Sequence, residues 1–185
     1  FVTGRSGSSI NYGIAVIEVS PGQYVKTIEG NIVHCVELSN SAYYFSSVDN
    51  AMVFHNLALD EKVSSDPDVR SFHLQTSSNN TFSCNRAEAY SVRNTSQKGF
   101  FISHLSPDNL FECNFVDKTS RGFQFEGQCL NTRLTTTSFN NHNRGLDLIA
   151  LSATLPQIGV QGATNDFWGN VWNNPSTGSN NWQAN

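Results

Sequence analysis

Three short segments of nearly the same sequence recur at a fixed interval of 23 residues. Each begins with a basic residue and a glycine, and apolar side chains follow at the third and fifth places. A repeat of this length with one short alternating strand per copy is typical of a solenoid. The segments are residues 98–102 (KGFFI), 121–125 (RGFQF) and 144–148 (RGLDL).

Alternation along each segment places its third and fifth residues on one face of a strand. Stacking the copies one strand spacing apart puts like side chains on one another and builds a continuous apolar interior. We therefore predict an all-β fold, a single-stranded parallel β-helix, in which the glycines and the apolar residues after them are structural. These structural residues are Gly99, Gly122, Gly145, Phe100, Phe123 and Leu146.

The composition narrows the class of protein further. Charged residues make up 14% of the chain, the formal net charge is −4, and thirteen Phe need burial. This balance argues against disorder and against nucleic acid as a partner. No apolar run approaches the roughly 18 residues of a membrane span, so we predict none. No signal peptide is present and the chain opens on Phe1, which favours a mature or excised piece of a longer protein.

We divide the chain into β-helix coils over residues 1–150 and an irregular segment over 151–185. A charged stretch near 59–70 reads as a loop leaving the solenoid, since it lacks the spacing of a calcium loop. The last segment holds all three Trp. We favour it as a cover for, or continuation of, the last coil. The alternative is that Trp168 and Trp172 offer aromatic platforms to sugar rings.

Two cysteines stand in matching contexts, Phe-Ser-Cys84-Asn and Phe-Glu-Cys113-Asn. They would stack on neighbouring coils within reach of a disulfide, although two small buried thiols are the reading we favour. Their spacing is 29 residues, so one coil carries an insertion, within 86–97 or 103–108. The chain has no close cysteine pair or His-x-x-x-His spacing, and we predict no metal and no cofactor.

The basic residues before the glycines form a second periodic set, Lys98, Arg121 and Arg144. Unpaired charges are not tolerated in a dry core, so we expect the strands to begin at or after glycine and these residues to lie at the turn. Stacked like charges repel. Asp117, Glu112 or Asp147 would offset them in a surface ion network, which we favour over an acidic polysaccharide ligand.

One further set carries polar side chains at a periodic place. Asn94, Asp117 and Asn140 share the 23-residue phase, and we predict a structural ladder at a β-helix corner. Asp147 lies on the outward face of its strand. Beside Arg121 or Arg144 it forms a candidate acid–base pair, but a surface salt bridge is the favoured interpretation. We assign no catalytic residue.

One motif brings a known family into view: Asn-x-Phe-x-Cys-Asn at 80–85 and 109–114, followed by a turn and a Gly-led alternating strand. It resembles the right-handed parallel β-helix repeat proteins of the pectate-lyase-like superfamily. The tail, at 158–162 and 165–168, looks like large secreted surface proteins of Bacteroidota, many exported by the type IX route. The resemblance implies a right-handed solenoid in an extracellular or cell-surface protein.

The catalytic motifs of that superfamily are missing from the sequence. Polygalacturonase-like members use paired aspartates with Gly-His-Gly and Arg-x-Lys, and pectate lyases use an Arg-x-Pro-x-x-Arg setting; neither set occurs here. We expect a non-enzymatic extracellular β-solenoid segment of a larger surface, adhesive or fibre-forming protein. The alternatives are a polysaccharide lyase or glycoside hydrolase, or a carbohydrate-binding module, on the same fold. Polysaccharide or other surface proteins are the expected partners.

Overall fold

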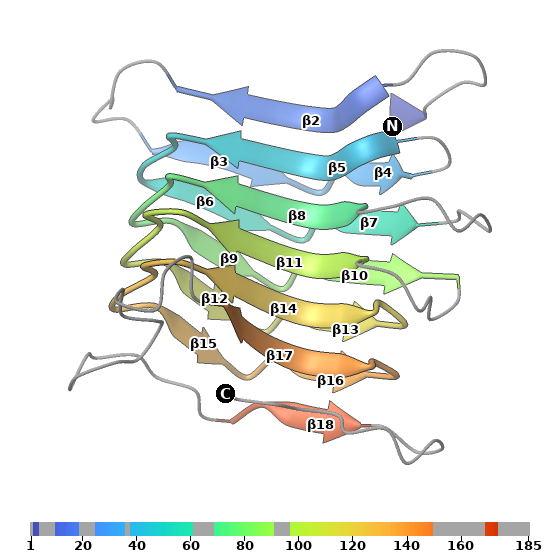
Figure 1. Ribbon diagram of the computed structural model, residues 1–185. Coiled ribbons are helices and arrows are strands. Elements are labelled where there is room, and N and C mark those ends of the chain that lie inside the picture. Colours follow the sequence, from blue (N-terminus) through green and yellow to red (C-terminus); the bar gives the residue numbers. More distant parts are fainter. Residues whose placement is uncertain are drawn as a thin grey trace.

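The computed structural model describes residues 2–3, 10–18, 25–35, 38–60, 69–90, 97–149 and 169–173. In these parts of the chain every regular element is a β-strand. The strands stack in layers along one axis, from β2 at one end to β18 at the other (Figure 1). The prediction of an all-β solenoid is confirmed.

The strands form three sheets, here named A, B and C, and every pairing within them is parallel. Sheet A contains β1 (Val2–Thr3), β4 (Ile32–His34), β7 (Leu57–Asp60), β10 (Arg86–Ala89), β13 (Phe115–Asp117), β16 (Ser138–Asn140) and β18 (Val171–Asn173). Sheet B contains β2 (Ile10–Ile17), β5 (Leu38–Ser46), β8 (Arg70–Gln75), β11 (Lys98–Ser103), β14 (Arg121–Glu126) and β17 (Arg144–Ile149). Sheet C contains β3 (Lys26–Glu29), β6 (Ala51–Phe54), β9 (Thr81–Ser83), β12 (Leu110–Glu112) and β15 (Arg133–Thr135).

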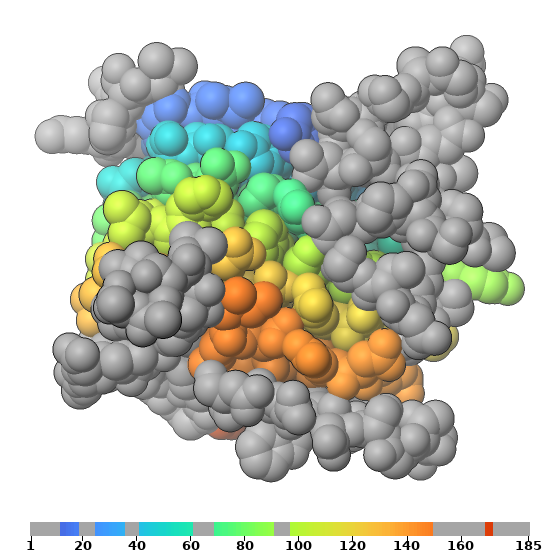
Figure 2. All heavy atoms as spheres, viewed as in Figure 1, coloured from blue at the N-terminus to red at the C-terminus, as the bar shows by residue number. Residues whose placement is uncertain are grey.

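One coil of the solenoid passes through sheets B, C and A in turn, as β8, β9 and β10 do. The next coil repeats the order and pairs with the one before it. Figure 2 shows the coils as successive layers at the surface, from blue at the N-terminal end through green and yellow to the orange coil that contains β17. Because each strand pairs only with its counterparts one coil away, a side-chain type repeated at one coil's spacing becomes a row along the axis.

Stacked aromatic rings fill the interior behind sheet B. The rings of Tyr43, Phe72, Phe100 and Phe123 lie face to face, with centroids 4.7, 4.6 and 4.3 Å apart in succession. All four side chains are fully buried. Leu146 continues the row on β17. The predicted stacking of Phe100, Phe123 and Leu146 is therefore confirmed, and burial of rings of this size is a major source of stability.

The glycines after Lys98 and Arg121 face the core. A Cβ added to Gly99 would lie 2.5 Å from Cγ1 of Val116 and 2.6 Å from the carbonyl oxygen of Gly122, so the two sheets approach too closely for a side chain. Phe100 is buried in the core as well, so the inside–outside alternation is interrupted at the glycine. Lys98 consequently lies on the outer face with Phe101, over whose ring its Nζ sits.

This arrangement corrects one prediction. The strands begin at Lys98, Arg121 and Arg144 themselves, not at or after the glycine, and the basic residues belong to the strand and not to the turn. The expectation assumed unbroken alternation, which would have aimed these charges at the core. The interrupted alternation removes that conflict.

A ladder of asparagines lies inside the corner between sheets C and A. The backbone N–H of Asn85 donates to Oδ1 of Asn114, that of Asn56 to Asn85, and that of Asn31 to Asn56, at 3.0–3.1 Å. Asn170 takes the same place beside Thr137 in the last described coil. A residue with positive φ precedes each rung of this corner. These residues are Gly30, His55, Cys84, Cys113, Thr136 and Gly169.

The predicted ladder of Asn94, Asp117 and Asn140 is confirmed for the register of its last two members and is wrong for the place of its first. Asp117 pairs with Asn140 on one side, but its partner on the other is Glu88, and Asn94 lies outside the described residues. The reason is the insertion, which falls between Glu88 and Lys98, inside the first of the two ranges predicted for it. A 23-residue phase counted back from Asp117 therefore misses the register.

Two predicted segments are described only in part. In the stretch near 59–70, residues up to Asp60 belong to β7, and β8 begins at Arg70. In the segment 151–185, β18 pairs with β16 and extends sheet A by one strand. Trp168 lies outside the described residues, and Trp172 is described only through its backbone pairing with Phe139.

Candidate functional site

The outer face of sheet B gathers most of the predicted site residues. Two rows run across its strands in register. The basic row consists of Arg70, Lys98, Arg121 and Arg144. The outward row consists of Tyr44, His73, Phe101, Gln124 and Asp147.

Each basic side chain contacts the outward residue three positions later on its own strand. Nη1 of Arg121 donates to Oε1 of Gln124 at 2.8 Å, and Nη1 of Arg144 to Oδ1 of Asp147 at 3.2 Å. Lys98 Nζ lies 4.9 Å from the centroid of the Phe101 ring, a cation–π contact. The spacing of three is a consequence of the interrupted alternation, which leaves both residues of each pair on the outer face.

Asp147 offsets two members of the basic row. Its Oδ2 lies 3.0 Å from Nε of Arg121 on the neighbouring coil, in addition to the contact with Arg144 on its own strand. The Arg121 contact is an ion pair without hydrogen-bond alignment, since Oδ2 is buried without a hydrogen-bond partner. Of the three acids proposed to offset the basic row, the structure places Asp147 against it.

The aromatic part of the outward row is also enclosed by its neighbours. The His73 ring lies between Tyr44 and Phe101, with centroids 5.0 and 4.9 Å away. Its Nε2 is 3.3 Å from Oγ of Ser103, and its Nδ1 is 3.3 Å from Nη1 of Arg70. These contacts use both ring nitrogens within the face.

Exposure decides what this face offers to a ligand. His73, Phe101, Gln124 and Asp147 are buried, although they point away from the core. The Arg121 and Arg144 side chains are 27% and 47% exposed, while that of Asp147 is 9% exposed. The accessible chemistry is therefore guanidinium, which suits the recognition of carboxylate or sulfate groups.

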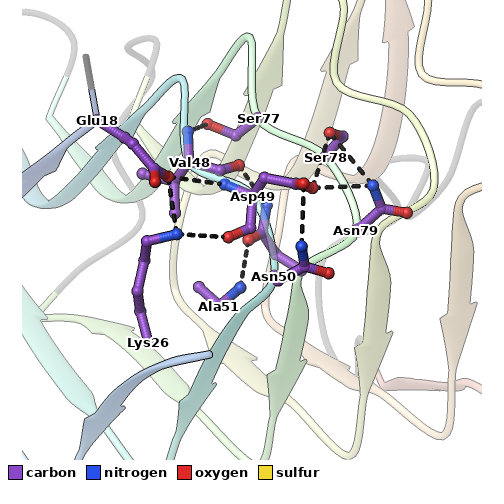
Figure 3. Close-up of polar contacts among 10 residues, drawn as sticks. Glu18, Lys26, Val48, Asp49, Asn50, Ala51, Ser77, Ser78 and Asn79 are labelled. Carbon is purple, nitrogen blue, oxygen red and sulfur yellow. Dashed lines mark hydrogen bonds and ion pairs between the residues drawn. The ribbon is translucent and has the colours of Figure 1, made fainter. Parts of the chain in front are cut away.

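A second polar cluster lies at the corner between sheets B and C (Figure 3). Lys26 Nζ donates to the carbonyl oxygen of Asp49 at 2.8 Å and forms an ion pair with Glu18 at 2.8 Å. The Asp49 carboxylate accepts hydrogen bonds from Ser78 Oγ at 3.1 Å and Asn79 Nδ2 at 2.8 Å. The cluster ties three successive coils together, and the contacts explain it as a structural clamp.

The two matching cysteines lie on the outside of the C–A corner, one coil apart. Cys84 is half-buried, Cys113 is exposed, and both are free thiols. The favoured reading of two buried core thiols is therefore wrong for this pair, because the corner turns both side chains away from the interior. Cys35 and Cys129 are the cysteines that lie in the core.

Asp117 and Asn140 are half-buried on the outer face of sheet A. Over the described ranges, no group of three or more His, Cys, Asp or Glu side chains is placed to hold a metal ion. Those same ranges contain no helix with the length and apolarity that crossing a membrane requires.

The residues that sequence reasoning missed are the ladder asparagines. Asn85 and Asn114 are the last residues of the repeated Asn-x-Phe-x-Cys-Asn motif, and Asn80 and Asn109 are its first. Asn80 and Asn109 form a second, parallel ladder at the B–C corner, where the N–H of Asn80 donates to Oδ1 of Asn109 at 3.0 Å. The repeated motif could have revealed both ladders, because each copy has an asparagine at its first and last positions, on either side of an inward-facing Phe.

A comparison of the chain with protein families, with curated proteins and with solved structures finds no match. The function is therefore inferred from the geometry described above.

Proposed function

We propose that the chain is a non-enzymatic, extracellular β-solenoid segment of a larger surface, adhesive or fibre-forming protein. The proposal includes right-handed coiling of the solenoid, which is the handedness expected of parallel crossover connections. It also includes the likeness to secreted pectate-lyase-like proteins. In that role the protein supplies a rigid axis and regular faces, and its side chains hold the coils in register.

One observation supports the proposal above the others. The polar groups on the outer face of sheet B are engaged with one another: Asp147 with two arginines, and Gln124 with Arg121 and with Glu126. A general acid or base needs a proton-transfer partner on a substrate within hydrogen-bond reach. Here the carboxylate that best fits such a role is enclosed by the guanidinium groups of its own face.

The location is tested on intact cells of the organism that makes the protein. Antibodies raised against this chain should label unpermeabilised cells or the medium, and a cytosolic marker should stay unlabelled in the same preparation. Labelling that requires permeabilisation would contradict the proposal.

The absence of catalysis is tested by incubating the purified chain with acidic and neutral polysaccharides and measuring new reducing ends and unsaturated products. We expect none above the level of a heat-denatured sample. Turnover that disappears in both Asp147→Asn and Arg121→Gln would overturn the non-enzymatic assignment in favour of a lyase or hydrolase.

The basic row favours a second candidate function, binding of an acidic polysaccharide. Arg121 and Arg144 repeat at one coil's spacing and keep part of their surface exposed. A polyanion lying along the axis would meet successive guanidinium groups, with Asp147 as an internal competitor for both. Such binding would weaken with salt, because exposed charges are screened.

Competition by Asp147 makes this candidate testable in two directions. Retention on immobilised alginate or polygalacturonate at low salt should fall in Arg144→Gln and rise in Asp147→Asn, which releases both arginines. Arg133→Gln on sheet C is the matched control and should leave retention unchanged. Equal loss in Arg133→Gln and Arg144→Gln would indicate nonspecific charge attraction and exclude a site on sheet B.

A further inference from the structure

The outside of the C–A corner holds two thiols that the fold fixes side by side. The strand before them pairs Ser83 with Glu112, and the strand after them pairs Arg86 with Phe115. The backbone N–H of Cys84 donates to the carbonyl oxygen of Glu112 at 3.0 Å. Cys84 and Cys113 therefore occupy the same place on adjacent coils.

The two thiols are close enough to interact electrostatically. Oγ of Ser83 donates to Sγ of Cys84 at 3.7 Å. Adjacent parallel strands are about 4.8 Å apart, which lies inside the range of Cα separations that a disulfide spans. Both residues have positive φ, 51° and 56°, so the side chains leave the corner from the same backbone geometry.

Exposure separates this pair from the other cysteines. Cysteine is among the most frequently buried residue types, and Cys35 and Cys129 follow that rule. Cys113 is exposed and Cys84 half-buried, which leaves a path for a small reagent. Packing therefore does not account for a cysteine at both places, since the same row elsewhere carries His55 and Thr136.

We propose that Cys84 and Cys113 are an oxidisable dithiol site, which closes to a disulfide that joins two adjacent coils. The oxidant is a low-molecular-weight disulfide. The thiolate of one cysteine attacks it, forms a mixed disulfide and releases one thiol. The second cysteine, as thiolate, attacks the protein sulfur of that mixed disulfide and releases the other. The protein loses two hydrogen atoms, and the oxidant is reduced to two thiols.

The local chemistry sets the pH dependence of closure. The neighbouring Cys84 thiol, burial and the Glu112 carboxylate raise the pKa of the Cys113 thiol to about 11. Attack requires a thiolate. Closure should therefore be slow at pH 7 and accelerate as the pH rises to 9, because the thiolate fraction grows.

The test uses the intact chain with oxidised glutathione at pH 7, 8 and 9, followed by alkylation of remaining thiols and peptide mapping without reduction. We expect a linked peptide pair containing Cys84 and Cys113, lost on treatment with dithiothreitol. The melting midpoint of the oxidised protein should rise by about 5–10 °C, because the bond closes a long loop in the unfolded chain.

Matched variants isolate the site. Cys84→Ser and Cys113→Ser should each show no linked peptide and no rise in the melting midpoint with oxidant. Cys35→Ala should retain both. The proposal is overturned if the wild-type protein at pH 9 yields only glutathione adducts on these cysteines, or only disulfide-linked dimers. Either outcome would mean that the two sulfurs cannot reach bonding distance within one chain.

Discussion

Oδ1 of Asn114 accepts hydrogen bonds from both the backbone N–H and the side-chain amide of Asn85, at 3.0 and 3.2 Å. Oδ1 of Asn85 accepts the corresponding two hydrogen bonds from the backbone N–H and the side-chain amide of Asn56, one coil earlier, at 3.1 and 3.0 Å. The remaining amide proton of Asn85 goes to the carbonyl oxygen of Val53 at 2.8 Å. One side chain thus satisfies two buried backbone groups of the preceding coil, where water has no access.

Replacing Asn85 with alanine should lower the free energy of unfolding by about 1–3 kcal/mol, because it leaves the Asn56 N–H buried without its Asn85 acceptor and removes one hydrogen bond to the Val53 carbonyl. Urea unfolding followed by circular dichroism measures the change. Asn140→Ala on the outer face of sheet A is the control, with an expected change within about 0.5 kcal/mol. Equal losses of stability in the two variants would contradict a stabilising role of the Asn85 side chain in the ladder.

The aromatic stack behind sheet B predicts a larger effect. Phe100 lies between Phe72 and Phe123, fully buried. Phe100→Ala should cost about 3–5 kcal/mol through lost burial and the cavity left behind. Tyr90→Ala, at a side chain that is 73% exposed, should change stability by less than about 0.5 kcal/mol. Thermal and urea unfolding of both variants measure these changes. Similar small losses in the two variants would indicate a loosely packed interior.

The glycine row tests the close approach of two sheets. A Cβ on Gly122 would lie 2.5 Å from the carbonyl oxygen of Gly145 and 2.7 Å from the Phe139 ring, so Gly122→Ala should destabilise by about 1–3 kcal/mol or more. At Gly30 nothing lies within 4 Å, but φ is +66°. Gly30→Ala should therefore cost only about 1–2 kcal/mol of backbone strain. A smaller loss of stability in Gly122→Ala than in Gly30→Ala would argue against a close approach of the two sheets at Gly122.

His142 predicts an acid-sensitive contribution to stability. It is buried at the corner before β17, and burial lowers its pKa below the ordinary value of 6.5. Nε2 lies 3.1 Å from the carbonyl oxygen of Val116, and Nδ1 lies 3.0 Å from that of Thr119. The unfolded chain therefore takes up a proton at a higher pH than the folded chain does. The stabilisation is complete above pH 6.5 and is lost as the pH falls below it.

The measurement compares unfolding free energies at pH 7.5 and pH 5 for the wild type and for His142→Thr, the residue found one coil earlier at Thr119. The wild type should lose more stability on acidification, by up to about 1.4 kcal/mol per pH unit. His104→Asn, at an exposed histidine, should keep the wild-type pH dependence. Parallel pH profiles for wild type and His142→Thr would refute the prediction.

The sequence by itself determined the stacked, all-β architecture. Apolar residues at one coil's spacing after Gly99, Gly122 and Gly145 can share an interior only if the segments lie on one another, so periodicity and alternation were enough. The same regularity located the insertion in one of two ranges and put Asp147 beside Arg121 and Arg144.

Tertiary structure alone decided which polar residues share a row. The six extra residues before Lys98 shift the register of sheet A against a simple count, so Asp117 meets Glu88 and not Asn94. Likewise, the contact between Val116 and the Gly99 backbone interrupts the alternation and turns Lys98 outward. Both effects depend on contacts between coils, which a linear period does not contain. The outward placement of Cys84 and Cys113 follows from the same corner geometry.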